Sequence, residues 1–309
     1  MNLQQIEYIL AVDKHRHFAR AAEASFVTQP TLSMMIQKLE DELDVKIFDR
    51  SRQPVVPTEI GEKILAKARK VIYELEEFKN IVKTEKGIIS GEIRLGVIPT
   101  IAPYLLPMFL QSFSKKYENL KLIISENVTD TILAKLKTGE IDAGIMVMPD
   151  DGENYHEYEL YYEPFVVYST RPFNKEYLLA EDIDTEELLL LEEGHCFRTQ
   201  ILKFCELTKQ KNTRIEYSSG SLETLKNLTD KQLGITILPE MATLDFGPNE
   251  RKKLKYFAEP QPYRKVSIIT HRDFLKRRLI SLLQEGILEQ VPEKFKKQSG
   301  QEISFSRKT

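Results

Sequence analysis

The spacing of apolar residues predicts three helices at the start of the chain. The apolar side chains of the first helix share one face as far as about Lys14. A short, alanine-rich second helix covers residues 17–24, and a turn follows over 26–30. The third helix runs over 31–43, and Pro30 suits its first positions. Two short helices, a turn and a longer third helix are typical of a helix-turn-helix.

Two further elements follow. Residues 45–58 have the pattern of a two-stranded wing with basic residues at its tip. A long helix then runs from Glu59 to about Lys86, capped by Thr58 and ended by Gly87. Its apolar residues recur every three or four positions, close to a coiled-coil seam, at Ile60, Ile64, Ala68, Val71, Leu75, Phe78 and Val82. We expect a helix from a second chain to cover this seam; the alternative is a helix packed on its own domain.

The pattern changes to alternating strands and helices after Gly91. The β-α-β-α-β order of the first five elements implies a parallel sheet with right-handed crossovers. We predict strands over 92–98, 120–126, 141–148, 165–168, 188–191, 214–217, 234–238 and 266–271, and helices over 102–117, 129–138, from 196, from 222 and after 274. The tail over 292–309 is polar enough to be loosely held.

These elements predict three parts and an α/β class for the largest of them. We expect an all-α winged helix-turn-helix domain over 1–58, a linker (dimerisation) helix over 59–87 and a two-lobed α/β domain over 91–309. Lobe I comprises about 91–162 and 268–309, and lobe II about 163–267. Such lobes bind ligands where strand ends meet helix N-termini.

Composition indicates an ordinary soluble protein. The 309 residues carry a formal net charge of −3 and are 41% hydrophobic. Two cysteines in a chain of this length favour a reducing compartment over a disulfide scaffold. No leader pattern opens the sequence and no window approaches eighteen consecutive apolar residues. We therefore expect a cytoplasmic protein with no membrane segment, and we expect neither a cofactor nor a metal.

Charge alone does not identify the N-terminal domain as nucleic-acid binding. Residues 1–60 hold seven Lys and Arg against nine Asp and Glu, so there is no basic excess. The alternative to a DNA-binding domain is a small acidic helical domain that binds protein.

Both cysteines lie in one short segment, Gly194–Cys205. Cys196 follows a predicted turn and begins a predicted helix, between His195 and Arg198, a position that favours the thiolate. Cys205 lies nine residues further on, which is about 13 Å of helical rise. A disulfide needs its Cα atoms within about 7 Å, so the two thiols can bond only if the helix is taken apart. The pair is therefore either inert or a switch.

A long motif in the first sixty residues resembles the LysR-type transcriptional regulators. It reads Gln29-Pro30-Thr31-Leu32-Ser33-x-x-Ile36-x-Lys38-Leu39-Glu40-x-x-Leu43, followed by Phe48-x-Arg50 and Thr58-x-x-Gly61. The resemblance implies binding to double-stranded promoter DNA through a recognition helix lined by Gln29, Pro30, Thr31, Ser33, Met34, Gln37 and Lys38. It also implies phosphate contacts from Arg50 and Arg52. Three residues depart from the family pattern: Met35 replaces Gln, Asp44 replaces Gly and Ile60 replaces Ala.

The rest of the chain resembles the periplasmic-binding-protein-like effector domain of the same family, and in particular its hydrogen-peroxide sensors. The similar segments are 96–107, the Gly-His-Cys-x8-Cys element at 194–205, 221–227 and 234–239. The resemblance implies that Cys196 is the peroxidatic cysteine, oxidised to a sulfenic acid, and that Cys205 resolves it to a disulfide. It further implies that Thr100 and Thr129 hold peroxide and that His195 and Arg272 support charge. Thr199 departs from the pattern, because many of these sensors carry an acid there.

These expectations together describe a non-enzymatic activator of oxidative-stress genes. We expect that closing the disulfide unwinds the intervening helix and rearranges the dimer interface between effector domains. This rearrangement would change the spacing of the two DNA-binding domains. We expect a homodimer assembled into a homotetramer, contact with RNA polymerase, and resetting by a thiol reductant such as glutaredoxin or thioredoxin. One alternative is a regulator of the same family that binds a small organic effector in the inter-lobe cleft, with non-redox cysteines. Another is a thiol peroxidase with an appended DNA-binding domain.

Overall fold

The computed structural model describes residues 1–85, 89–152, 154–184, 186–205, 220–272, 274 and 277–306. The chain divides into two compact units, one formed by residues 1–90 with 137–139 and the other by 91–136 with 140–309. The observed class, a helical N-terminal unit followed by an α/β unit, confirms the predicted one. No helix in the described ranges is long and apolar enough to cross a membrane.

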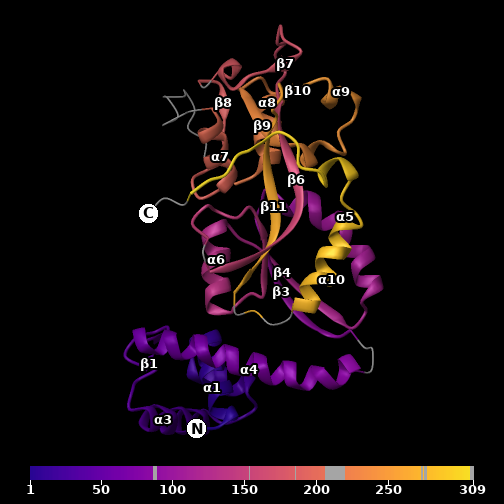
Figure 1. Ribbon diagram of the computed structural model, residues 1–309. Helices are drawn as coiled ribbons and strands as arrows, with labels where there is room; N and C mark the ends of the chain where they lie inside the picture. Colours follow the sequence, from indigo (N-terminus) through magenta and orange to yellow (C-terminus); the bar gives the residue numbers. More distant parts are fainter. Residues whose placement is uncertain are drawn as a thin grey trace. The chain divides into compact units, whose positions relative to one another are not determined.

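The N-terminal unit contains the predicted helix-turn-helix, wing and long helix (Figure 1). Its elements are α1 (Leu3–His15), α2 (Phe18–Ala24), α3 (Gln29–Leu43), β1 (Phe48–Asp49), β2 (Val56–Pro57) and α4 (Glu59–Glu85). Helix α3 begins two residues earlier than predicted because Thr28 caps it, its hydroxyl accepting from the Thr31 backbone N–H. The predicted end of the long helix, at Lys86 and Gly87, lies outside the described residues.

Two buried contacts hold the wing and α4 to this core. Glu40, 1% exposed, accepts a hydrogen bond of 2.8 Å from the Ile47 backbone N–H and forms a salt bridge of 3.1 Å with Arg50. Gly61 lies against the Ile47 carbonyl, where a Cβ atom would stand only 2.0 Å from the oxygen. The glycine of the Thr58-x-x-Gly61 motif is therefore required by close packing of α4 on the wing.

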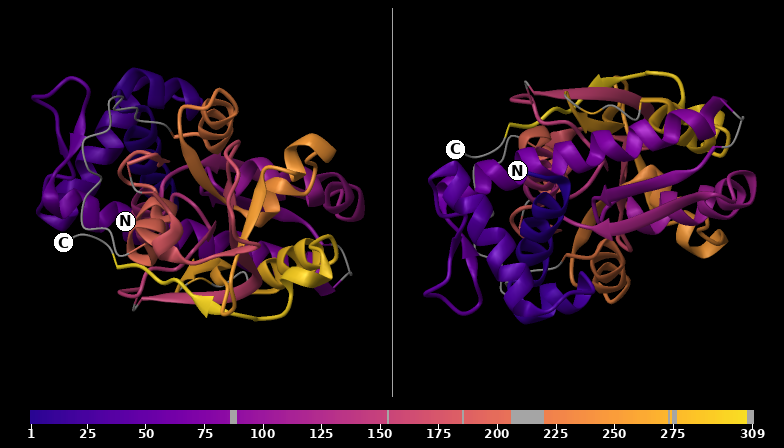
Figure 2. Two further views of the ribbon diagram at one scale, coloured as in Figure 1. Left: turned by 90° about the horizontal axis from the view of Figure 1, so that it is seen from above. Right: turned by 90° about the horizontal axis from the view of Figure 1, so that it is seen from below.

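The C-terminal unit is built on one curled sheet with the order β4-β3-β5-β11-β6-β10-β7, to which β8, β9 and β12 pair. In lobe I, β3 (Gly91–Val97) pairs in parallel with β4 (Leu120–Glu126) and with β5 (Ala143–Met146), as the sequence predicts. Helix α6 (Thr129–Thr138) lies on one side of these strands, and α5 (Ala102–Lys116) and α10 (Arg277–Leu288) lie on the other (Figures 1 and 2).

Two long antiparallel strands join the lobes. They are β6 (Tyr155–Tyr168) and β11 (Pro262–His271), much longer than the predicted 165–168 and 266–271. The first part of β6 pairs with β11, and its last residues pair with β9 (Ile235–Pro239) and β10 (Leu254–Phe257) of lobe II. The strand predicted over 214–217 falls outside the described residues.

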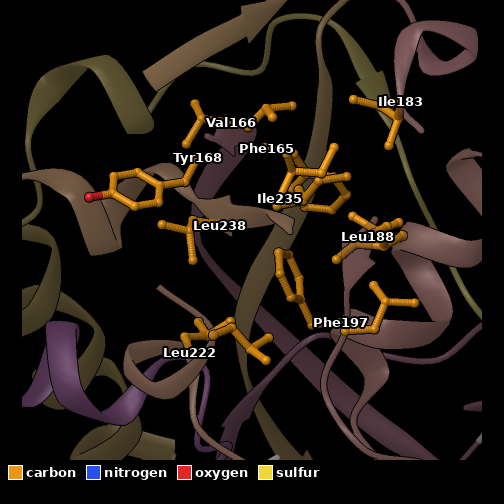
Figure 3. Close-up of a cluster of buried hydrophobic side chains, with 14 of the residues drawn as sticks. Phe165, Val166, Tyr168, Ile183, Leu188, Phe197, Leu222, Ile235 and Leu238 are labelled. Atoms are coloured by element: carbon orange, nitrogen blue, oxygen red, sulfur yellow. The ribbon is translucent and has the colours of Figure 1, made fainter. Parts of the chain in front are cut away.

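Lobe II also contains the cysteine helix. Its remaining elements are β7 (Tyr177–Leu178), β8 (Leu188–Leu189), α7 (Cys196–Phe204), α8 (Leu222–Asp230), α9 (Pro248–Arg251) and the 3-10 helices η1 (Ala180–Asp182) and η2 (Glu240–Thr243). Phe197 and Ile201 of α7 point into a buried apolar cluster with Phe165, Leu188 and Ile235, several of which are drawn in Figure 3. Packing of α7 on this cluster stabilises its helical form.

The C-terminal tail is not loosely held as far as Ser306, contrary to expectation. It forms η3 (Glu293–Phe295) and β12 (Gln301–Glu302), and β12 pairs in parallel with β11. Phe295, Ile303 and Phe305 are buried, so three apolar residues in a polar segment anchor it.

Candidate functional site

Cys196 is the first residue of α7 and is only 5% exposed. Gly194 adopts a φ of +94° and makes the turn that leads into the helix. His195 follows as the N-cap with extended backbone. The next residue, Phe197, packs edge-on against Phe165 with ring centroids 5.1 Å apart. These neighbours fix the thiol at the N-terminus of a helix, as the sequence predicts.

Arg264, which sequence reasoning missed, is the cation of this site. It lies on β11, is completely buried, and its guanidinium stands 4.8 Å from the centre of the Phe197 ring. Its Nη1 donates to the Thr100 hydroxyl at 2.8 Å, and its Nη2 donates to the Thr100 carbonyl at 3.0 Å. Because the Thr100 oxygen accepts from arginine, its own hydrogen remains available to donate.

The two threonines predicted from the sequence both come to the thiol site. Thr100 lies just before α5, and Thr129 is the first residue of α6; both are buried. The Thr129 hydroxyl has no hydrogen-bond partner within normal distance in the described structure, yet it lies near enough to Cys196 to lower the pKa of the thiol. Thr129 of lobe I therefore lies beside the thiol of lobe II, and Thr100 is connected to the same site through Arg264.

The pKa of Cys196 is raised above its ordinary value, which corrects the expectation that the helix N-terminus makes the thiolate the favoured form. Burial is the largest cause. The positive charge of Arg264, the Thr129 hydroxyl and the backbone N–H groups at the start of α7 all lower the pKa of this thiol but do not cancel burial. The site stabilises a thiolate once formed and keeps the resting group protonated.

His195 does not supply the supporting charge predicted for it. It is 6% exposed, and its ring Nε2 lies 3.8 Å from the Glu192 carboxylate. Burial lowers the pKa of His195, and Glu192 opposes this only in part. The imidazole is therefore neutral at pH 7, and the charge at the site comes from Arg264.

Arg272 is the sequence-predicted residue that the structure excludes from the site. It follows the last residue of β11, is exposed, and donates to the Asn154 side chain at 3.2 Å. Eight residues of extended strand, about 26 Å, separate it from Arg264. The local motif around Arg272 pointed to the wrong arginine, because Arg264 lies near the start of β11 whereas Arg272 directly follows its end.

Cys205 caps the other end of α7. Its backbone N–H donates to Ile201 at 2.9 Å, and its side chain packs beside Phe204 on the lobe II cluster. Burial raises the pKa of the Cys205 thiol to about 11. Both cysteines are free thiols. With α7 intact between them they lie about 13 Å apart along the helix axis, as predicted.

The residues predicted to contact DNA form a surface around the N-terminus of α3. Exposed members are Gln29, Pro30, Thr31, Met34 and Lys38, whereas Ser33 and Gln37 are half-buried. Arg50 donates to Ser33 at 3.3 Å and pairs with Glu40, so part of its charge is already used inside the domain. Arg52 pairs with Asp49 at 3.2 Å at the tip of the wing.

The departures from the family pattern have local explanations. Met35 packs on the N-terminal core, so its side chain fills space there. Asp44 takes the left-handed conformation, with φ at 52°, that ends α3. Ile60 is 42% exposed on α4.

The predicted seam of α4 is divided between two surfaces. Ala68 is buried and Ile64 packs against the N-terminal core. Val71 and Phe78 are 43% and 72% exposed. Val71 and Phe78 therefore remain exposed within the described part of the chain, Leu75 is half-buried, and the side chain of Val82 lies outside the described residues.

The described ranges contain no cluster of three or more His, Cys, Asp or Glu residues that could hold a metal ion. The site consists of a thiol, two hydroxyls and a guanidinium. Such a set of groups is suited to nucleophilic attack on, and hydrogen bonding to, a small polar molecule.

Comparison with known proteins matches both units. Residues 3–62 match the bacterial regulatory helix-turn-helix family of LysR type, and residues 86–291 match the LysR substrate-binding domain. A hydrogen peroxide-inducible genes activator from Dickeya chrysanthemi is 35% identical over 277 residues, covering 87% of this chain and 89% of the relative.

Solved structures give the same result. A full-length OxyR variant from Pseudomonas aeruginosa is 34% identical with a TM-score of 0.80, covering 94% of this chain and 99% of that one. An OxyR variant from Corynebacterium glutamicum with hydrogen peroxide bound is 28% identical with a TM-score of 0.60, covering 93% and 92%. Likeness thus extends through the helix-turn-helix and both lobes.

Proposed function

Because the chain belongs to the LysR family of bacterial helix-turn-helix regulators, we propose that it is a transcription activator that senses hydrogen peroxide through Cys196 and Cys205. The observation that carries this proposal is the position of the Cys196 thiol. It begins a helix of lobe II, faces Thr129 of lobe I and Arg264 of β11, and has the second cysteine at the far end of the same helix.

The first step is attack of the Cys196 thiolate on one peroxide oxygen. A sulfur–oxygen bond forms, the oxygen–oxygen bond breaks, and the distal oxygen leaves as water after taking one proton. Arg264 stabilises the thiolate and the negative charge on the leaving oxygen. The Thr100 hydroxyl, which accepts from Arg264, donates its hydrogen to peroxide and fixes its orientation. Cys196 is now a sulfenic acid.

The second step is condensation of the Cys205 thiol with the sulfenic acid. A sulfur–sulfur bond forms and the sulfenic oxygen leaves as water. The reaction requires α7 to unwind, since its ends lie farther apart than a disulfide spans. Unwinding withdraws Phe197 and Ile201 from the lobe II cluster, and this repacking is the signal. Two equivalents of a cellular thiol, of the glutaredoxin or thioredoxin type, reverse it.

The remaining parts transmit this signal to DNA. We assign the winged helix-turn-helix to 1–58, the dimerisation helix to 59–87 and the effector domain to 91–309. The recognition residues are Gln29, Pro30, Thr31, Ser33, Met34, Gln37 and Lys38, with Arg50 and Arg52 on phosphates. The exposed apolar side chains of α4 pair with those of a second chain, and two dimers assemble into a tetramer that contacts RNA polymerase.

The test is promoter footprinting of the reduced and oxidised protein beside two variants. Wild-type protein changes its footprint after one equivalent of peroxide. Cys196→Ser should give the reduced footprint with or without peroxide, and Cys205→Ser should accumulate a sulfenic acid without the change. A peroxide-dependent footprint that survives Cys196→Ser would instead support a regulator of small organic effectors. Rapid turnover of excess peroxide with reductant would support a thiol peroxidase.

A further inference from the structure

The carboxylate of Glu163 forms an ion pair with Arg264, the cation of the thiol site. It lies on β6 directly opposite Arg264 on β11, since the two residues are paired in the strand register. Its Oε2 accepts from the Arg264 Nε at 2.7 Å and lies 2.7 Å from Nη2. Its Oε1 accepts from the Met241 backbone N–H at 3.0 Å. Both oxygens thus receive N–H donors, the arrangement of a carboxylate.

This contact determines which way the guanidinium faces. The Nε edge is occupied by Glu163, and the ring of Phe197 lies 4.8 Å from the guanidinium carbon. The opposite end, Nη1, is left to reach Thr100, and the positive charge lies near Cys196. A planar group held by its edge and near an aromatic ring has little rotational freedom.

Stability alone does not account for this pair. Both side chains are completely buried, at 0% and 1% exposure, and a buried ion pair brings little net stability over apolar residues of similar volume. A buried ion pair at this position is explained if the positive charge of Arg264 has a function in the protein. The function that the structure offers is stabilisation of the Cys196 thiolate, because Arg264 lowers the pKa of that thiol.

We propose that Glu163 is the positioning residue of the thiol site: it sets the angle at which Arg264 reaches Thr100 and Cys196, and so sets the rate at which the thiol reacts. This inference rests on the proposed peroxide-sensing function and identifies a residue on which that function depends. Glu163 touches neither thiol nor oxidant, and its effect passes through Arg264.

The test compares two aspartate substitutions in protein carrying Cys205→Ser, in which Cys196 is the only thiol. Glu163→Asp keeps the charge that compensates Arg264 but draws the carboxylate back by one methylene. Glu157→Asp is the matched control, because Glu157 lies on the same strand and pairs with Lys265 of β11 at 3.1 Å. The readouts are the rate of sulfenic acid formation with peroxide at pH 7 and the pH profile of Cys196 alkylation by iodoacetamide.

Glu163→Asp should slow sulfenic acid formation about tenfold and move the alkylation profile to higher pH by about one unit, since one unit corresponds to a tenfold change in thiolate. Glu157→Asp should match the parent protein in both. Circular dichroism should show that both variants are folded. If folded Glu163→Asp reacts as the parent does, the inference is wrong.

Two further variants keep the outcomes distinct. Should Glu163→Asp not fold, Glu163→Gln keeps the side-chain length but offers one oxygen where the Arg264 Nε and the Met241 N–H each need an acceptor, so sulfenic acid formation should slow by about threefold or more. A Glu163→Gln protein that reacts as the parent does would overturn the positioning role. Arg264→Lys tests the proposed function itself. If it slows the thiol and Glu163→Asp does not, only the positioning role fails. If Arg264→Lys leaves the rate unchanged, the proposed thiol site fails with it.

Discussion

Cys196 and Cys205 occupy the two ends of one helix, the first as its opening residue and the second as its C-cap. Three of the residues between them are buried, namely Phe197, Gln200 and Ile201. The helix therefore holds the sulfurs apart for as long as it stays packed on lobe II. Oxidation has to work against that packing, which gives peroxide a structural consequence as well as a chemical one.

The choice of arginine can be tested by a matched pair of substitutions. Arg264→Lys keeps a positive charge but replaces the fork that contacts Thr100 and Glu163, so Cys196 should react with peroxide about tenfold more slowly. Arg272→Lys alters an exposed residue at the other end of β11 and should leave the rate unchanged. Stopped-flow kinetics in Cys205→Ser protein measures both. A slow Arg272→Lys with a normal Arg264→Lys would restore the prediction made from sequence.

The raised pKa of Cys196 has a pH signature. Burial raises the pKa of this thiol, so only a minor fraction is thiolate at neutral pH. Alkylation of Cys196 in Cys205→Ser protein should therefore rise about tenfold per pH unit between pH 7 and pH 9. Iodoacetamide labelling followed by mass spectrometry measures this. A rate that is already constant below pH 7 would show a preformed thiolate instead.

The C-terminal segment should oppose oxidation, because it packs on α7. Gln200 donates to the Ile303 carbonyl, Lys203 donates to Ser304 at 3.1 Å, and the Ile303 side chain joins the lobe II cluster. Ile303→Ala removes buried contacts from the cluster on which α7 packs, at a cost of about 2–4 kcal/mol to the reduced form. The thiol–disulfide equilibrium should shift toward the disulfide in a dithiothreitol titration.

Ser306→Ala serves as the control for the C-terminal segment. Ser306 donates to Asp150 at 3.3 Å from an exposed position and does not contact α7 through that bond. The midpoint of the Cys196–Cys205 thiol–disulfide equilibrium in Ser306→Ala protein should equal that of the wild type. An Ile303→Ala protein with the wild-type midpoint would mean that the segment does not restrain the helix.

Phe26 offers a stability prediction in the N-terminal unit. It ends α2 with a φ of 55° and is 96% exposed, while its backbone N–H donates to Glu23 and that of Val27 donates to Ala22. This is the position where helices usually place glycine. Phe26→Gly should raise the free energy of unfolding by about 1 kcal/mol, because it relieves the left-handed strain without losing buried contacts. Urea unfolding of the variant checks this, and a loss of stability would contradict it.

Local pattern was enough to predict most elements and the thiol pair. The apolar periodicity of 196–205, with a glycine turn before it, predicts a helix with cysteines at both ends, and the structure has that helix. The parallel strands of lobe I alternate with helices in the sequence as they do in space. These features depend on neighbours within about ten residues.

Features set by long-range pairing were missed. The charged residues Glu157, Glu159 and Glu163 and the proline at 164 hide the length of β6, because their partners Lys265 and Arg264 lie about a hundred residues away on β11. Without that register, nothing in the sequence distinguishes the buried Arg264 from the exposed Arg272. The missed cation and the missed strand length therefore have one cause.

The most direct test of the switch follows both the sulfurs and the helix in one sample. Reduced protein is treated with one equivalent of peroxide, its thiols are mapped by mass spectrometry, and amide hydrogen exchange is measured over 196–205. We predict a Cys196–Cys205 disulfide together with loss of exchange protection across α7. Free thiols at both positions, or a disulfide with protection of α7 unchanged, would contradict the account.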